Sequence, residues 1–134
     1  MTDLVFFYGT LMSGFKRAGR ERLDAKLTPV GRGSIHAALF DVGLYPAAIP
    51  ASDAFVQGEL HRMSDAVSVL RELDAIEGFR PEQPDASLYM RLETPVTLSD
   101  GRTESAWTYF YNAPLGNAPR IESGDYLDYL RVKR

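Results

Sequence analysis

The chain of 134 residues contains no cysteine. This absence excludes disulfides, thiolate metal ligands and a cysteine nucleophile. It is also compatible with a reducing compartment, and we expect a cytoplasmic protein. Catalysis, if the chain is an enzyme, therefore depends on oxygen and nitrogen groups.

Histidine is nearly as scarce, because only His36 and His61 occur and they lie far apart in the sequence. Neither stands in a pattern with a carboxylate and a second histidine, so we predict no metal site. Gly31-Arg32-Gly33 lacks the third glycine of a dinucleotide-binding fingerprint. A phosphate-binding loop and a Gly-x-Ser-x-Gly nucleophile motif are absent as well.

Long apolar runs are missing too, since no stretch approaches the ~20 residues needed to span a bilayer. The start, residues 1–4, lacks the basic region of a signal peptide. The formal net charge is -3 and the sequence pI is about 5.3. Because nucleic-acid binders usually present a strongly basic face, we predict neither a nucleic-acid nor a membrane partner.

One short basic segment, residues 16–22, contains Lys16, Arg17, Arg20 and Arg22 and is interrupted by an acidic residue. We interpret it as a solvated loop and helix face. The alternative is a rim that attracts an anionic small molecule.

The remaining composition is that of a globular protein, with 45% hydrophobic and 25% charged residues. This size fits a single domain over residues 1–134 that buries its own core. Apolar and aromatic runs bounded by glycine, proline or aspartate predict strands over residues 4–8, 35–42, 55–63, 88–93 and 105–112. Asp100-Gly101 predicts a hairpin between the last two strands, and Pro95 is expected to disturb the first of them.

The best-supported helix carries apolar residues every three positions, at Val67, Leu70, Leu73 and Ile76. Ser64 is the expected N-cap, with Asp65 in the first turn, and Gly78 is the expected end. Weaker patterns predict a short helix over residues 20–27 and a closing turn or short helix over 126–131. We expect Pro29 and Gly31-Arg32-Gly33 to break the helix over residues 20–27, and residues 45–47 to form an edge or irregular stretch.

Too few helices separate the strands for an alternating β-α-β-α series. We therefore predict an α+β fold, with a small, mixed, mostly antiparallel, barrel-like sheet, one main helix and short helical segments.

A first candidate site is the junction Tyr8-Gly9-Thr10-Leu11, directly after the first buried strand. A glycine there allows a sharp turn and the close approach of a ligand. Successive amides in such a turn can hold an anion such as a carboxylate. The alternative is an ordinary tight turn.

A second candidate is Glu77, the last residue of the main helix before Gly78. A carboxylate is disfavoured at this end, which carries partial negative charge. If the helix end also faces an apolar cavity, both effects raise the pKa of Glu77 and suit it to proton transfer. The alternative is a solvated surface glutamate.

The chain resembles the γ-glutamylcyclotransferase-like family. The matching pieces occur in order along the chain up to about Asn112: Tyr8-Gly9-Thr10-Leu11-Met12, Tyr45-Pro46-Ala47, Leu73-Asp74-Ala75-Ile76-Glu77-Gly78, Tyr89-x-Arg91 and the aromatic strand Trp107 to Tyr111. After the first loop many relatives have an Asn/His-containing stretch, whereas this chain has Phe15-Lys16-Arg17-Ala18-Gly19.

The resemblance implies a small barrel, an enzyme that releases 5-oxoproline from γ-glutamyl compounds, and no metal or other cofactor. It implies that Glu77 is the catalytic acid/base and that the loop Tyr8, Gly9, Thr10 and Leu11 cradles the substrate. Tyr89, and Tyr109 or Tyr111, are expected to wall the cavity or to donate a hydrogen bond. The expected partner is a small γ-glutamyl molecule, and no oligomeric state is predicted. The alternatives are a non-catalytic carboxylate-binding protein and a scaffold of the same fold.

Overall fold

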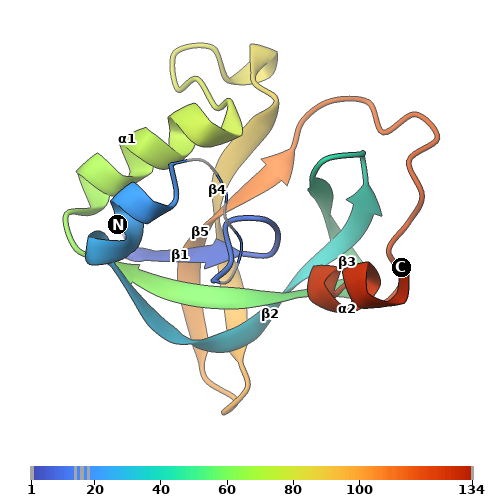
Figure 1. The fold of residues 1–134 in the computed structure, drawn as a ribbon, viewed down its shortest axis with the longest axis horizontal. Coiled ribbons are helices and arrows are strands. Elements are labelled where there is room, and N and C mark those ends of the chain that lie inside the picture. Colours follow the sequence, from blue (N-terminus) through green and yellow to red (C-terminus); the bar gives the residue numbers. More distant parts are fainter. Residues whose placement is uncertain (1, 14, 16, 18, 134) are drawn as a thin grey trace.

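The computed structural model describes residues 2–13, 15, 17 and 19–133. Its elements are, in order, β1 (Leu4–Phe7), the 3-10 helix η1 (Glu21–Lys26), β2 (Leu27–Asp41), β3 (Pro46–Met63), α1 (Ala66–Glu77), the 3-10 helix η2 (Pro84–Ala86), β4 (Tyr89–Leu98), β5 (Thr103–Tyr111) and α2 (Tyr126–Lys133). Figure 1 shows α1 lying across one side of the sheet and α2 apart from it, beside the ribbon of β2 and β3.

The five strands close into a barrel in the order β1-β3-β2-β4-β5. Neighbouring strands are antiparallel, except that β1 and β5 pair in parallel at Val5 and Trp107. The side chains of β1 are buried throughout and form part of the core. The predicted α+β class, with a mixed and mostly antiparallel sheet, is confirmed.

The strands β2 and β3 are longer than the sequence indicates. The helical segment ends before residues 29–33, as predicted, but β2 starts at Leu27 rather than Ile35 and runs through them with a register shift between Pro29 and Gly31. Of the two alternatives for residues 45–47, an edge or an irregular stretch, the irregular one is wrong beyond Tyr45, whereas Pro46 and Ala47 pair with β2 alone. Pro46 starts β3 opposite Asp41, at the first strand position, where the missing proline N–H is tolerated.

The helix α1 ends as predicted at Glu77, with Gly78 at φ +71 as its C-cap. Its start differs from the prediction, because Asp65 rather than Ser64 is the N-cap and accepts a hydrogen bond from the Ser68 N–H at 3.4 Å. Its buried face also differs, since Val67 is 60% exposed. The residues that this face buries are Val69, Leu70, Leu73 and Asp74.

The hairpin predicted at Asp100-Gly101 connects β4 and β5. Pro95 does not interrupt β4, because it keeps its place in the register opposite Ser105. The short helix expected over residues 20–27 is the 3-10 helix η1. The short helix expected near the end of the chain is α2, which begins where the prediction put it.

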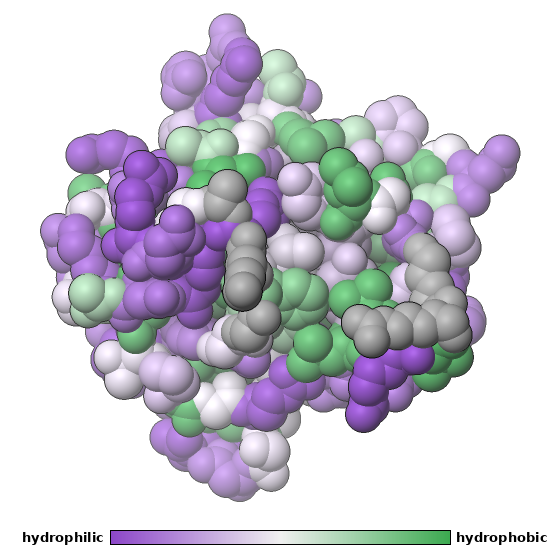
Figure 2. Space-filling model, in the orientation of Figure 1, coloured by the Kyte–Doolittle hydropathy of each residue, from purple (hydrophilic) through white to green (hydrophobic). Residues whose placement is uncertain are grey.

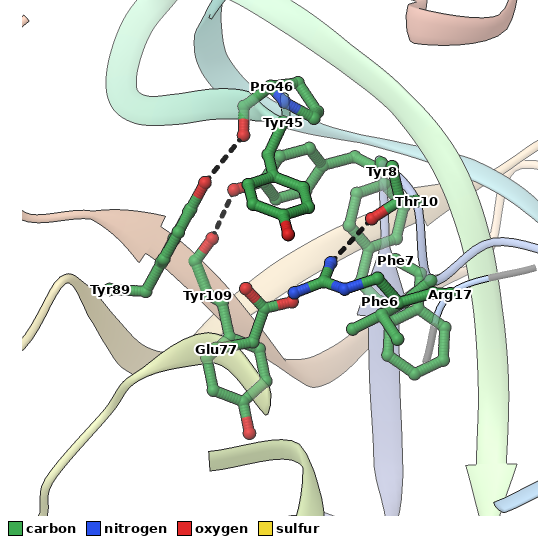
Figure 3. A pocket seen from close by; sticks show the side chains of 12 residues that line it. Phe6, Phe7, Tyr8, Thr10, Arg17, Tyr45, Pro46, Glu77, Tyr89 and Tyr109 are labelled. Carbon is green, nitrogen blue, oxygen red and sulfur yellow. Dashed lines mark hydrogen bonds between the residues drawn. The ribbon is translucent and has the colours of Figure 1, made fainter. Parts of the chain in front are cut away.

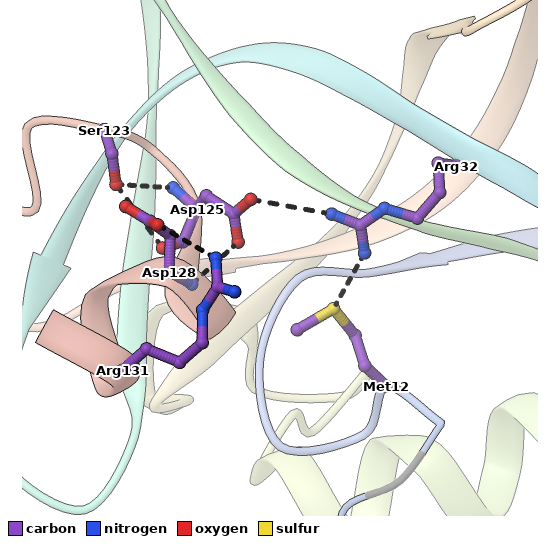
Figure 4. A network of polar contacts seen from close by, with 6 residues as sticks. All are labelled: Met12, Arg32, Ser123, Asp125, Asp128 and Arg131. Atoms are coloured by element: carbon purple, nitrogen blue, oxygen red, sulfur yellow. Dashed lines mark hydrogen bonds and ion pairs between the residues drawn. The ribbon is translucent and has the colours of Figure 1, made fainter.

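The C-terminal helix is tied to the barrel through Arg32 of β2. The Arg32 guanidinium forms an ion pair with Asp125 at 3.8 Å and contacts the Met12 sulfur at 3.8 Å (Figure 4). Asp125 also accepts a hydrogen bond from the Asp128 N–H at the start of α2, at 3.2 Å. These contacts connect α2 to the loop that follows β1.

On the face of the molecule that Figure 1 shows, strongly hydrophilic side chains gather on the side of α1. Hydrophobic side chains reach the surface between α1 and α2 (Figure 2). Within the described ranges, no helix has the length and apolar character needed to cross a membrane.

Candidate functional site

A narrow cavity lies where the loop after β1, the last turn of α1, the start of β3 and the strands β4 and β5 meet (Figure 3). The volume of this cavity is ≈ 30 Å³. Its lining consists of Phe6, Phe7, Tyr8, Gly9, Thr10, Leu11, Arg17, Tyr45, Pro46, Glu77, Tyr89 and Tyr109. The lining includes Glu77 and the expected substrate-binding residues Tyr8, Gly9, Thr10, Leu11 and Tyr89, and their roles stay predictions.

The Glu77 carboxyl group points into the cavity from the C-terminal end of α1 (Figure 3). Burial raises the pKa of Glu77 to about 7, and the nearby Arg17 guanidinium opposes this rise. A carboxyl group with such a pKa can both accept and return a proton near neutral pH. The expectation that the helix end faces a cavity therefore holds for this side chain.

The loop after β1 forms a turn in which the Met12 N–H donates to the Gly9 carbonyl at 3.0 Å. The amide N–H groups of Gly9, Thr10 and Leu11 donate no hydrogen bond to any other described residue. Since these residues also line the cavity, their unpaired amides are available to an acceptor brought by a ligand.

Gly9 also has a packing reason to be glycine. A Cβ atom at this position would lie 2.7 Å from the Pro46 Cγ and 3.0 Å from the Pro46 Cδ. Real Cβ atoms do not come so close to a ring, so a side chain would push the loop away from the start of β3. The sequence predicted the need for glycine from the turn alone and did not indicate this contact.

Buried tyrosines form the inner wall of the cavity. The Tyr8 hydroxyl donates to the Tyr109 carbonyl at 2.5 Å, and the Tyr89 hydroxyl donates to the Pro46 carbonyl at 2.9 Å. Burial raises the pKa of Tyr8, Tyr89 and Tyr109 well above the usual range, so all three stay protonated. Tyr111, the other strand tyrosine named from the sequence, does not line the cavity and packs its ring 5.3 Å from that of Tyr89.

A buried polar network holds the last turn of α1 against β4 and β5. Arg91 donates two hydrogen bonds to the Asp74 carboxylate, at 2.8 and 3.1 Å, and the Tyr109 hydroxyl donates to the same carboxylate at 2.7 Å. The Arg91 guanidinium also lies 4.7 Å from the centre of the Trp107 ring. Asp74 precedes Glu77 by one helical turn, so the network fixes where Glu77 points.

Sequence reasoning quoted Asp74 and Arg91 as parts of matching motifs but gave neither of them a role. The available signal was the place of Asp74 on the helix. It shares the apolar face of α1 with Leu70 and Leu73 and is only 7% exposed. A charged residue on a buried face requires a partner of opposite charge.

The basic segment after the first loop is not uniformly solvated, which corrects the favoured interpretation. Arg20 is 8% exposed, donates to the Leu11 carbonyl at 2.9 Å and forms an ion pair with Asp24. Arg17 lines the cavity, whereas Arg22 is exposed. Lys16 lies outside the described residues.

The far end of the loop is fixed by Glu59 of β3. Its carboxylate accepts a hydrogen bond from the Ser13 N–H at 2.8 Å and contacts the His61 Nε2 at 3.1 Å. The hydrogen bonds from His61 and Ser13 lower the pKa of Glu59 even though burial opposes them. In the part of the chain that the structure describes, no three His, Asp or Glu side chains gather in a way that can hold a metal ion.

Comparison with protein families matches residues 5–128 to the family described as "Gamma-glutamyl cyclotransferase, AIG2-like". A relative from Escherichia coli K12, named "Gamma-glutamylcyclotransferase family protein YtfP", is 33% identical over 127 residues, which cover 92% of this chain and 96% of the relative. The relative of the same name from Citrobacter rodentium is 32% identical over 127 residues, covering 92% of this chain and 95% of the relative.

Solved structures share the fold. The solution structure of Escherichia coli ytfP has a TM-score of 0.68 and 31% sequence identity, and the match covers 94% of this chain and 97% of that one. A crystal structure of an aig2-like protein from Mus musculus also has a TM-score of 0.68. Its sequence identity is 20%, over 90% of this chain and 86% of that one, so this likeness is one of fold alone.

Proposed function

The chain belongs to the gamma-glutamyl cyclotransferase, AIG2-like family, and on this premise we propose that it is an enzyme that releases 5-oxoproline from a γ-glutamyl amine or γ-glutamyl peptide. Glu77 is the general acid/base in this proposal. The observation that carries it is that Glu77 and the residues Gly9, Thr10 and Leu11, whose amides have no acceptor among the described residues, line one cavity although they are distant in the sequence.

The reaction needs no nucleophile from the protein, because the α-amine of the substrate attacks its own γ-carbonyl carbon. Glu77 takes one proton from the α-ammonium, and the freed amine attacks to form the C–N bond of a five-membered ring. As the bond to the leaving nitrogen breaks, the ring nitrogen gives up a second proton to solvent and becomes the lactam N–H. Glu77 returns the first proton to the leaving nitrogen, so the amine departs neutral and the carboxylate is restored, and the amine takes up the second proton from solvent as an ammonium. A pKa of about 7 suits both proton transfers.

The amides of Gly9, Thr10 and Leu11 supply donors for the substrate α-carboxylate and for the oxyanion that develops at the γ-carbonyl. Tyr8 and Tyr89 contribute the wall rather than hydrogen bonds, because the backbone carbonyls of Tyr109 and Pro46 already accept from their hydroxyls. A narrow pocket with such walls favours the folded conformation in which the amine meets the carbonyl.

The test is to incubate the protein with a panel of γ-glutamyl amines and dipeptides and to measure 5-oxoproline by mass spectrometry. Glu77→Gln should lower kcat by about 100- to 10,000-fold. The exposed Glu82, also a glutamate near the end of α1, provides the control variant Glu82→Gln, which should keep wild-type turnover. In the wild type, kcat/KM should rise with pH through about 7, as Glu77 loses its proton.

Full activity of Glu77→Gln would contradict the mechanism. If no compound is turned over but a γ-glutamyl compound raises the melting temperature, the protein is a carboxylate-binding module and the enzymatic proposal is wrong.

A further inference from the structure

Arg17 is held in place at the cavity by three separate parts of the chain. Its guanidinium donates to the Thr10 hydroxyl at 2.6 Å and to the Ile76 carbonyl at 3.3 Å. The guanidinium carbon also lies 4.3 Å from the centre of the Tyr45 ring, which is a cation–π contact. The loop after β1, the end of α1 and the turn between β2 and β3 thus fix one cation beside Glu77 (Figure 3).

The positive charge of Arg17 is not neutralised by an ion pair. No carboxylate among the described residues lies within 4.0 Å of its nitrogens, whereas Arg20 pairs with Asp24 and Arg91 pairs with Asp74. A guanidinium has five N–H donors, and the two bonds above use two of them. A fixed arginine with free donors is suited to a carboxylate, which matches its planar, forked geometry.

The place of Arg17 in the cavity indicates which part of a substrate it meets. The inner wall consists of the buried tyrosines Tyr8, Tyr89 and Tyr109, which are 3 to 6% exposed. Arg17 and Tyr45 are partly exposed and form the outer rim. The γ-glutamyl group must reach the inner part of the cavity, whereas the group that leaves must lie toward solvent.

We propose that Arg17 binds a carboxylate on the leaving group, so that the preferred substrates are γ-glutamyl amino acids or peptides with a free carboxylate rather than neutral γ-glutamyl amines. This inference rests on the proposed function. It makes Arg17 the residue that selects the leaving group, at the position where the sequence departs from the Asn/His-containing stretch of many relatives.

A purely structural role is the competing explanation. The Ile76 carbonyl belongs to the last turn of α1, and a cation at a helix C-terminus is favourable whether or not a ligand is bound. The same guanidinium also opposes the rise that burial causes in the pKa of Glu77. Replacing Arg17 therefore affects every substrate to some degree, and only a comparison between substrates can isolate the binding of a carboxylate.

The experiment uses two substrates of nearly equal size, γ-glutamyl-alanine and γ-glutamyl-alanine amide, which differ in one carboxylate. The ratio of their kcat/KM values is measured for the wild type, Arg17→Gln, Arg17→Lys and the control Arg22→Gln, which removes an exposed charge from the same segment. The wild type should prefer the acid. In Arg17→Gln the acid-to-amide ratio should fall about 10- to 100-fold.

Arg17→Lys should keep part of the preference because it keeps the charge without the fork, and Arg22→Gln should keep all of it. An unchanged ratio in Arg17→Gln overturns the inference and leaves the proposed function standing. Equal losses for both substrates also overturn it, because they show that Arg17 acts on the common γ-glutamyl group or on the fold. Absence of 5-oxoproline from both substrates with the wild type overturns this inference, and its absence from the whole panel of γ-glutamyl compounds overturns the proposed function as well.

Discussion

Replacing Glu77 by glutamine should make the folded protein more stable while it removes activity. The pKa of this carboxyl rises from 4.5 to about 7 because folding buries it, which corresponds to about 3 kcal/mol. Between these two pH values the folded chain holds a proton on Glu77 that the unfolded chain has lost. The free energy of unfolding of the wild type therefore falls as the pH rises through this interval.

Glutamine has nearly the same shape and carries no charge at any of these pH values. The stability difference between Glu77→Gln and the wild type should thus be close to zero at pH 4 and reach about 3 kcal/mol in favour of the variant above pH 7.5. Urea denaturation followed by tryptophan fluorescence, at intervals from pH 4 to pH 8.5, measures this difference. The single Trp107 lies in the barrel and serves as the probe.

The control Glu82→Gln removes an exposed carboxylate and should differ from the wild type by less than about 0.5 kcal/mol at every pH. The argument for a raised pKa is refuted if Glu77→Gln is no more stable than the wild type at pH 8. It is also refuted if the difference in the free energy of unfolding does not depend on pH, because burial of the carboxylate then does not destabilise the folded protein.

Two further predictions concern the frame around the site. Gly9→Ala should destabilise the protein by about 1–3 kcal/mol and raise KM, because the new methyl group meets the Pro46 ring. Thermal unfolding and steady-state kinetics measure these two effects, and a melting temperature and a KM equal to those of the wild type would refute the prediction. Asp74→Ala should lower the free energy of unfolding by about 3 kcal/mol, because it leaves the partly buried Arg91 guanidinium without its carboxylate partner. The double variant with Arg91→Met should recover part of this loss, and a merely additive loss would contradict the reading of the pair.

The features that the sequence predicts well are those set by neighbouring residues. The end of α1 follows from an apolar repeat and one glycine, Gly78, and the β4–β5 hairpin follows from Asp100-Gly101. Glu77 is a candidate from the sequence because it places a carboxylate at the C-terminal end of a helix, where a negative charge is disfavoured. A residue that breaks such a local rule often has a function. Here, the structure gives it a cavity to face.

The features that sequence reasoning missed depend on contacts between distant residues. Pro29 and Pro46 look like breaks, yet β2 and β3 run on because each proline stands where its missing N–H is harmless, beside a register shift or at a strand start. The burial of Arg20 and the placing of Arg17 at the cavity both depend on how the loop after β1 folds back over the barrel. No periodicity in residues 16–22 encodes that path.

The parallel pairing of β1 with β5 has a consequence for synthesis on the ribosome. Val5 is made about a hundred residues before its neighbour Trp107, and the Tyr8 hydroxyl likewise lacks the Tyr109 carbonyl until β5 is made. Contacts between such remote positions slow folding because a long segment must close before they form. The growing polypeptide thus keeps the apolar strand β1 without one of its two partners until β5 has been made, and the hydrogen bond that ties Tyr8 to β5 forms only then.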